Sequence, residues 1–327
     1  MAKRDAVQET LERLKSLEDG DPCSPETIAA LRKALSSRAA LVAGRAARIA
    51  GRHTLTALIS DLSRAFDAFL SDPRHADRGC SAKLPIAEAL DLLEHDDPGP
   101  FLAGVRHVQL EPGPRGEIDV AAPLRGRCVA ALVRLRHPEA HREVARLLFD
   151  RWPEARFGAA RAAGFDGGKE AELLLRARVH AGDPDPRILG ACLSGLLSIA
   201  PSSSLEIVKG SLDSLDDEVA EQAALALAES RHPEALACLR DAWDRWPNES
   251  RRRGLLLPIS LLRSDEAVAF LVDVVREGPT SLARETVRTL AVGLVRPEFL
   301  SIVRAAAESR GDPDLLRAFD RELGHGR

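Results

Sequence analysis

Residues 136–140 read Arg-His-Pro-Glu-Ala, and the same five residues return at 231–235. Each copy is followed by Asp-Arg-Trp-Pro, at 150–153 and again at 244–247. The two copies lie about 95 residues apart, which equals three units of about 32 residues. A fixed period of this length is typical of chains built from repeated helical units. The duplication therefore predicts two further units between the copies.

The interval between the copies contains segments with apolar residues at helical spacing, at 168–180, 185–199, 203–213 and 216–229. Helix-breaking residues separate them, for example Ala200-Pro201-Ser202. Proline followed by glutamate opens several segments, because proline at the first helical position loses no hydrogen bond and glutamate faces the positive end of the helix dipole. Counted along the chain, first helices of pairs are predicted to begin near residues 25, 55, 101, 137, 168, 201, 232, 264 and 296.

The composition supports a helical array. Aromatic residues make up only 4% of the chain and tyrosine is absent, whereas alanine and leucine, which favour helix, are abundant. We predict an all-α fold, a right-handed α-solenoid of about nine helix pairs, in which each pair packs only on its neighbours. Residues 1–20 are expected to form an N-terminal capping helix. Residues 21–327 are expected to form a single array with an irregular insertion near 110–120.

Two segments carry a family resemblance. Residues 217–227 and 185–193 each resemble the second helix of a HEAT repeat, and the similarity covers residues 24–320. Within residues 77–128, the phrases Gly-Cys-Ser-Ala-Lys and Arg-His-Val-Gln resemble a group of stand-alone bacterial HEAT-repeat proteins. The first resemblance implies an architecture, and the second implies a bacterial source. They imply no particular activity, because HEAT arrays serve unrelated functions.

The bulk charge and the cysteines limit the function classes. A net charge of −4 and a pI near 6.2 argue against a dedicated nucleic-acid binder, which usually carries a strong basic excess. Five scattered cysteines without a CxxC pair fit reduced thiols better than a disulfide framework. We find no signal-peptide pattern and no apolar window long enough to cross a membrane. A cytoplasmic protein without a membrane partner is expected.

The candidate chemical groups do not form a known catalytic motif. Cys80, Lys83 and His107 would make an activated thiol only if the fold brought them together, and we favour a structural role for Cys80. His137 and His141 have the spacing of a metal pair, but His137 belongs to the duplicated turn and no third ligand is evident. Phosphate-binding, zincin and hydrolase motifs are not found. We therefore expect no enzyme activity, no cofactor and no metal.

Arginine is concentrated on the predicted second helices. Four arginines share one face of a single helix, Arg38, Arg45, Arg48 and Arg52. Because second helices line the concave surface of HEAT arrays, such a face would attract acidic protein segments. Solvated arginines, or arginines that pair between repeats, are the alternative. The candidate partner-binding residues are Arg45, Arg48, Arg127, Arg251, Lys83, Arg106 and His107.

These features favour a non-catalytic protein–protein interaction scaffold, a monomer that binds a protein partner with an acidic segment on its concave face. One alternative is a nucleic-acid-binding protein of the HEAT-like DNA glycosylase type, which would need a strongly basic cleft. A second alternative is a protein like the bilin lyases, which use similar repeats, although no specific residue of this chain supports it.

The repeat interpretation predicts modular folding, because each unit of an array is stabilised mainly by its neighbours. A fragment that ends near Ala200 should fold as a helical protein with a lower free energy of unfolding than the full chain. Far-ultraviolet circular dichroism and thermal unfolding would measure both properties. A random-coil spectrum from this fragment would contradict modular folding.

Overall fold

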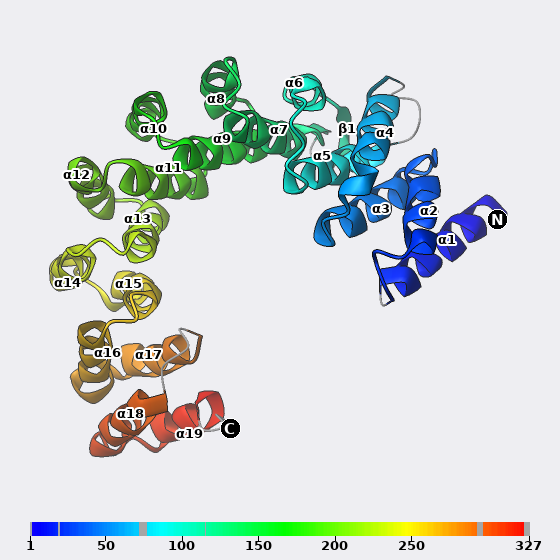
Figure 1. The fold of residues 1–327 in the computed structure, drawn as a ribbon. Helices are drawn as coiled ribbons and strands as arrows, with labels where there is room; N and C mark the ends of the chain where they lie inside the picture. The colour runs from blue at the N-terminus through cyan, green and yellow to red at the C-terminus, as the bar shows by residue number, and fades with distance from the viewer. Residues whose placement is uncertain (1, 19, 72–76, 115, 293–296, 324–327) are drawn as a thin grey trace. The chain divides into compact units, whose positions relative to one another are not determined.

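A computed structural model of the chain describes residues 2–18, 20–71, 77–114, 116–292 and 297–323. The chain folds into two compact units, residues 1–166 and 167–327. The described part of the chain contains nineteen α-helices, two short 3-10 helices and one two-stranded antiparallel sheet (Figure 1). No described helix is both long enough and apolar enough to cross a bilayer.

The first unit contains nine α-helices, two short 3-10 helices and the sheet. In chain order these are α1 (Ala2–Glu18), α2 (Pro25–Leu35), α3 (Ala40–Arg52), η1 (Thr56–Leu58), α4 (Ile59–Ser71), η2 (Arg78–Cys80), α5 (Lys83–Leu92), α6 (Gly99–Gly104), β1 (Leu110–Gly113), β2 (Gly116–Asp119), α7 (Ala122–Arg134), α8 (Ala140–Leu148) and α9 (Pro153–Asp166).

The second unit is helical throughout its described residues. Its helices are α10 (Lys169–Ala181), α11 (Pro186–Ile199), α12 (Pro201–Leu212), α13 (Asp217–Ser230), α14 (Ala235–Arg245), α15 (Glu249–Leu261), α16 (Asp265–Glu277), α17 (Thr280–Val292), α18 (Pro297–Ser309) and α19 (Pro313–Glu322).

The helices pair along the chain as the repeat pattern predicts. From α2/α3 to α8/α9 in the first unit, and from α10/α11 to α18/α19 in the second, each helix contacts its pair partner, which gives nine pairs among the described residues. The second helices also pack on one another, in the orders α3–α5–α7–α9 and α11–α13–α15–α17–α19. Each first helix begins within four residues of its predicted start. The all-α fold of stacked helix pairs is confirmed.

The N-terminal helix α1 packs against α3 and α2. It ends before a loop in which Ser24 caps α2, accepting a hydrogen bond from the backbone nitrogen of Thr27 at 3.1 Å. Pro25 occupies the first helical turn, as the sequence pattern predicts. The predicted bounds of a cap over residues 1–20 and one array over residues 21–327 stay predictions.

The duplicated sequence phrase folds into the same turn in both copies. Arg136 and Arg231 each have a left-handed backbone, with φ of 51° and 53°. The next residue, His137 or His232, accepts a hydrogen bond through Nδ1 from a backbone nitrogen two residues later, at 3.2 and 3.1 Å. The histidine therefore satisfies a donor near the start of the following helix. His137 is thus used in the turn chemistry that the sequence favoured over a metal site.

Consecutive second helices approach each other very closely at glycine. A Cβ atom built on Gly158 of α9 would lie only 2.4 Å from the Cα atom of Gly126 on α7. The two backbones are therefore in direct contact, and a side chain at either position would separate them. Buried alanines on both helices, including Ala131, Ala155 and Ala159, also line the interface between α7 and α9.

The predicted insertion near 110–120 contains a β-hairpin. β1 and β2 pair antiparallel, with Leu110 opposite Asp119 and Glu111 opposite Ile118. Arg115, which lies between the two strands in the sequence, is outside the described residues. The hairpin joins α6 to α7, so the end of β2 leads directly into a second helix.

The α7–α9 contact predicts opposite effects for two glycine substitutions. Gly158→Ala should lower the free energy of unfolding by about 1–3 kcal/mol, because the new methyl group meets backbone atoms that cannot move aside. Gly210→Ala on α12 is the control, because no atom lies within 4 Å of the position of its Cβ. It should raise stability by about 0.5–1 kcal/mol through helix propensity. Urea titration followed by circular dichroism would measure both; equal effects would refute the close contact.

Candidate functional site

A buried polar cluster lies where the hairpin meets the second helices, and Gln109 is its centre. The amide Nε2 of Gln109 donates to the carbonyl oxygen of Asp77 at 2.7 Å and to Glu111 Oε1 at 2.6 Å. Its Oε1 accepts from Lys83 Nζ at 2.6 Å and from Cys80 Sγ at 3.4 Å. One side chain thus joins the segment before α5 to the start of the hairpin.

Asp77 organises the start of α5. Its carboxylate accepts hydrogen bonds from the backbone nitrogens of Ala82, at 2.7 Å, and Lys83, at 3.1 Å. The same carboxylate lies 3.4 Å from Lys83 Nζ. The Lys83 side chain is 1% exposed, and its charge is compensated inside the protein by Asp77, while Gln109 accepts a hydrogen bond from it. Removal of the Asp77 carboxylate would leave a buried charge unpaired, which is strongly destabilising.

Asp119 and Arg125 connect the hairpin to α7. Asp119 accepts from the backbone nitrogens of Gln109, at 2.9 Å, and Ala121, at 3.0 Å. Arg125, which is almost fully buried, pairs with Asp119, donates to the His107 carbonyl oxygen at 2.9 Å, and reaches Asp150 Oδ1 at 3.1 Å. Because Asp150 precedes α9, this arginine links the hairpin to two neighbouring repeats.

Burial controls the ionisation of the cluster. It raises the pKa of the Cys80 thiol to about 12, although the nearby Lys83 charge acts in the opposite direction. Burial, followed by the Lys83 charge, lowers the pKa of His107. The arrangement therefore stabilises a protonated thiol and a neutral imidazole at neutral pH, not a thiolate–imidazolium pair. His107 Nε2 is buried and has no hydrogen-bond partner among the described residues.

The structure brings together residues that no sequence spacing linked. Cys80 and Lys83 share the Gln109 amide oxygen, and His107 lies within reach of the Lys83 charge. Sequence reasoning did not assign roles to the acidic partners or to Gln109. The available signal was the density of polar residues within 77–128, in a chain whose repeats otherwise bury mainly alanine and leucine.

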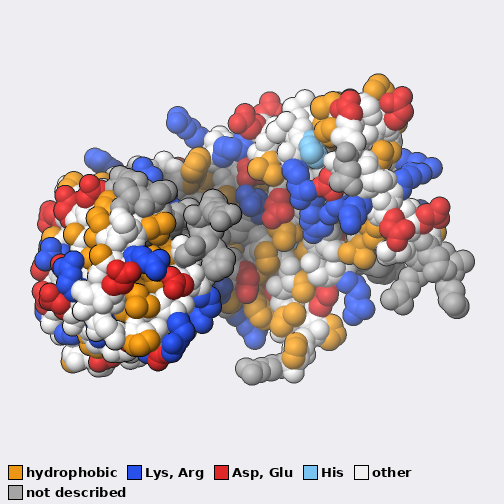
Figure 2. All heavy atoms as spheres, turned by 90° about the horizontal axis from the view of Figure 1, so that it is seen from below, with side chains coloured by type: hydrophobic (Ala, Val, Ile, Leu, Met, Phe, Trp, Pro, Cys, Tyr) orange, Lys and Arg blue, Asp and Glu red, His pale blue; other side chains and the backbone are white. Residues whose placement is uncertain are grey.

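The arginines of α3 form a second group, which lies on the surface. Arg45 and Arg52 both pair with Glu18, at the end of α1. Arg48 lies between them on α3, is exposed, and makes no ion pair with any described residue. Figure 2 shows several Lys and Arg side chains gathered on the face that it presents, among acidic and apolar ones.

Arg127 continues the basic surface onto α7. It lies 3.4 Å from Asp91 and 3.9 Å from Glu88, both on α5, and its side chain is 40% exposed. Arg134, about two helical turns further along α7, also pairs with Asp91, at 2.8 Å. Two carboxylates, Glu88 and Asp91, therefore meet two arginines, Arg127 and Arg134, where α5 packs against α7.

The remaining candidates, Arg106 and Arg251, have mainly structural contacts. Arg106 is exposed but binds Glu143 through Nε at 2.8 Å. Arg251 is 14% exposed, pairs with Asp217 at 3.3 Å, and places its guanidinium 4.5 Å from the centre of the Trp246 ring. Lys83 and His107 belong to the buried cluster. We therefore do not include these four residues in a partner-binding surface.

Comparison with known proteins gives no close relative. No family model and no curated protein matches the sequence. Among solved structures, the chain is similar to the complex of CpcE and CpcF of phycocyanin lyase from a Nostoc species, at 15% identity over 89% of this chain and 96% of that chain, with a TM-score of 0.36. An engineered protein gives 15% identity, 98% and 94% coverage, and a TM-score of 0.35. Human deoxyhypusine hydroxylase in complex with glycerol gives 17% identity over 79% of this chain and 98% of that chain, with a TM-score of 0.30. With TM-scores this low, the assignment of a helical repeat fold rests on the helix pairs themselves.

The expectation that the chain is not an enzyme has to be corrected. Two of the solved structures to which it is similar are a lyase and a hydroxylase, so helical repeats of this kind do not argue against catalysis. The physical reason is that an array supplies only a scaffold, and chemistry depends on the side chains that it positions. Neither similarity transfers an activity to this chain.

The burial of the cluster predicts a simple pattern of thiol reactivity. Of the five cysteines, only Cys23 is exposed. In the folded protein, Ellman's reagent should label Cys23 within minutes and leave Cys80 unmodified, because thiolate is the reactive form and burial raises the pKa of Cys80 to about 12. All five should react in guanidinium chloride. Rapid labelling of Cys80 in the folded state, detected by mass spectrometry, would show that the thiol is activated.

Proposed function

We propose that the chain binds a protein partner through an acidic segment, on the surface that α3, α5 and α7 present in the first unit. The surface is defined by Leu41, Arg45, Arg48, Leu92 and Arg127. Exposed cations on adjacent second helices carry the proposal, and Arg48 is the central one because no described carboxylate pairs with it.

The pattern on α3 favours a helical or extended protein segment. Leu41, Arg45 and Arg48 follow one another at spacings of four and three residues, so they lie on one face of the helix. Leu41 is 59% exposed and Leu92, on the neighbouring helix α5, is 60% exposed. A partner with carboxylates and an apolar side chain would therefore meet both kinds of group. Charged contacts of this kind increase the association rate and the specificity.

The second helix α13 of the second unit does not offer an equivalent surface. On α13, Asp217 already pairs with Arg251 of α15, and Glu218 and Glu221 add further negative charge. Desolvation and these neighbouring carboxylates raise the pKa of Glu221. An acidic partner would be repelled there. The proposal concerns the first unit, where Arg48 and Arg127 lie on α3 and α7.

The other functions considered have weaker support. A nucleic-acid duplex needs many phosphate contacts, and the basic surface of α3, α5 and α7 also carries Glu88 and Asp91. A bilin-lyase-like activity remains compatible with the similarity to phycocyanin lyase subunits, but no residue described here favours it. The monomeric state and the cytoplasmic location stay predictions.

A designed peptide tests the proposal directly. The probe is a fluorescein-labelled helical peptide with glutamates and leucines on one face, compared with the same peptide carrying glutamine in place of glutamate. The double variant Arg48→Glu/Arg127→Glu should raise the Kd for the acidic peptide at least tenfold, about 1.4 kcal/mol. It should also reduce the salt dependence of binding, measured by fluorescence anisotropy.

The matched control is Arg142→Glu, an exposed arginine on the first helix α8 that lies outside the surface. It should leave the Kd unchanged within about twofold, and circular dichroism should show equal helix content for all three proteins. The proposal fails if the double variant binds as tightly as the unaltered chain, or if the glutamine peptide binds equally well.

A further inference from the structure

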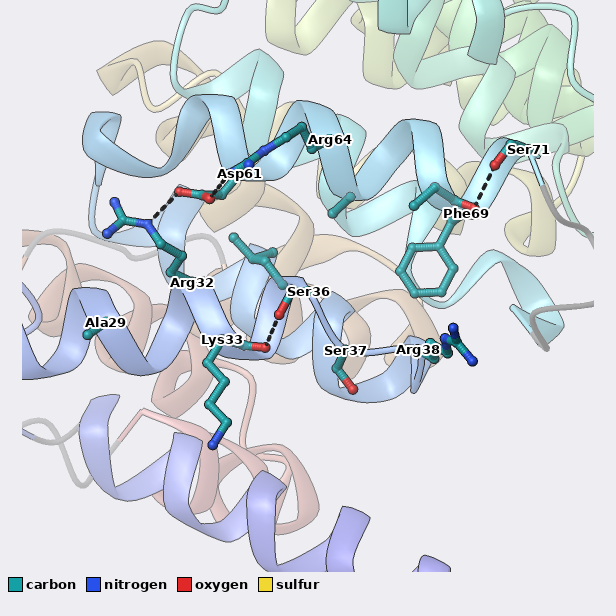
Figure 3. A pocket seen from close by; sticks show the side chains of 13 residues that line it. Ala29, Arg32, Lys33, Ser36, Ser37, Arg38, Asp61, Arg64, Phe69 and Ser71 are labelled. Carbon is teal, nitrogen blue, oxygen red and sulfur yellow. Dashed lines mark hydrogen bonds and ion pairs between the residues drawn. The ribbon is translucent and has the colours of Figure 1, made fainter.

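The first unit also has a groove between the first helices of two neighbouring pairs. None of its lining residues belongs to the surface proposed to bind a protein partner. The groove lies between α2 and α4, with a volume of about 810 Å³ (Figure 3). Buried apolar side chains form its floor, namely Leu35, Ala65 and Phe69. This volume falls within the range of cavities that hold small organic molecules, roughly 300–1,000 Å³.

Cationic residues border the groove, and Figure 3 shows the Lys33 side chain directed away from α4. Arg32, Lys33, Arg38 and Arg64 line it, together with the single carboxylate of Asp61. Three serine hydroxyls complete the polar lining. Lys33 and Arg38 make no ion pair with any described residue, so their charge is not compensated within the described structure.

Asp61 holds two of these arginines in place. Its carboxylate is 8% exposed, and it accepts a hydrogen bond from Arg32 Nε at 2.9 Å and a second one from Arg64. Arg32 has no other hydrogen bond in the described structure, so both of its terminal nitrogens remain available to a ligand. Figure 3 shows this arrangement at one end of the groove, with Phe69 and Arg38 at the other end.

Helix electrostatics explain only part of this charge. Arg32 and Lys33 lie in the last turn of α2, where cations stabilise the negative end of the helix dipole. Arg38 lies beyond that helix, and Arg64 lies in the middle of α4 with 76% of its side chain exposed. The helix dipole therefore does not explain why Arg38 and Arg64 lie beside an apolar groove floor.

We propose that this groove binds an amphipathic organic anion, a carboxylate or phosphate ester attached to an apolar body. The apolar body would pack on Leu35, Ala65 and Phe69, and the anionic group would be bound by the Arg38 guanidinium at the Phe69 end of the groove. Arginine suits this task because its planar group binds carboxylate or phosphate through two parallel hydrogen bonds. The groove is formed by first helices, and it is therefore separate from the surface proposed to bind a protein partner.

Competition between matched ligands tests the chemical class. The fluorescent probe is 1-anilinonaphthalene-8-sulfonate, which is displaced by decanoate, decyl phosphate, decanol, acetate or inorganic phosphate. Decanoate or decyl phosphate should compete at least tenfold more strongly than decanol. Each of these two amphipathic anions should also compete more strongly than acetate or inorganic phosphate. Stronger competition by decanoate identifies a carboxylate ligand, and stronger competition by decyl phosphate identifies a phosphate ester. Equal competition by decanol would overturn the proposal.

Two variants locate the binding. Arg38→Glu reverses an exposed charge, and Ala68→Trp fills the groove from an exposed position on α4, so neither disturbs the core. Each should raise the Kd of the preferred ligand at least tenfold. Arg161→Glu, an exposed arginine on α9 outside the groove, should leave it unchanged. If both groove variants bind as the unaltered chain does, the ligand binds elsewhere and the proposal is wrong.

Discussion

The contact between α7 and α9 determines the arrangement around it. Because neither Gly126 nor Gly158 carries a side chain, the two helix backbones touch, and their direction is fixed by backbone atoms. Arg125 precedes Gly126 on α7, so the same contact sets the position from which this arginine reaches Asp119 and Asp150. Side-chain packing alone would allow more adjustment, since alanine and leucine contacts tolerate small shifts.

The polar cluster makes the hairpin part of the array. A short two-stranded hairpin is marginally stable by itself, and here Gln109 and Asp119 attach it to α5 and α7 through groups that are buried and paired. Such pairs contribute little net stability but are costly to break. They therefore specify one arrangement of the segments. The unpartnered Nε2 of His107 is the exception within this network.

Local signals in the sequence predicted the helices well. Contacts between residues that are far apart in the sequence could not be predicted from it. Pro25 and Pro201 mark helix starts because proline chemistry acts within one turn. The periodic arginines of α3 were equally visible, but the carboxylate that pairs with Arg45 lies in another helix, at Glu18. The contacts of Lys83 and Arg251 likewise depend on partners brought near by folding, Gln109 and Asp217. A cation on a helix face does not reveal from its spacing whether it meets water or a partner.

The ion pairs of Glu18 have a consequence for any ligand of α3. One carboxylate, supplied by α1, serves both Arg45 and Arg52. An incoming acidic group that binds either arginine has to compete with this internal carboxylate, so its affinity is reduced by the internal equilibrium. Arg48 has no such competitor among the described residues. Glu18 of the N-terminal helix thus acts as an intramolecular competitor. Only an acidic group that binds Arg45 or Arg52 more strongly than Glu18 does would displace it.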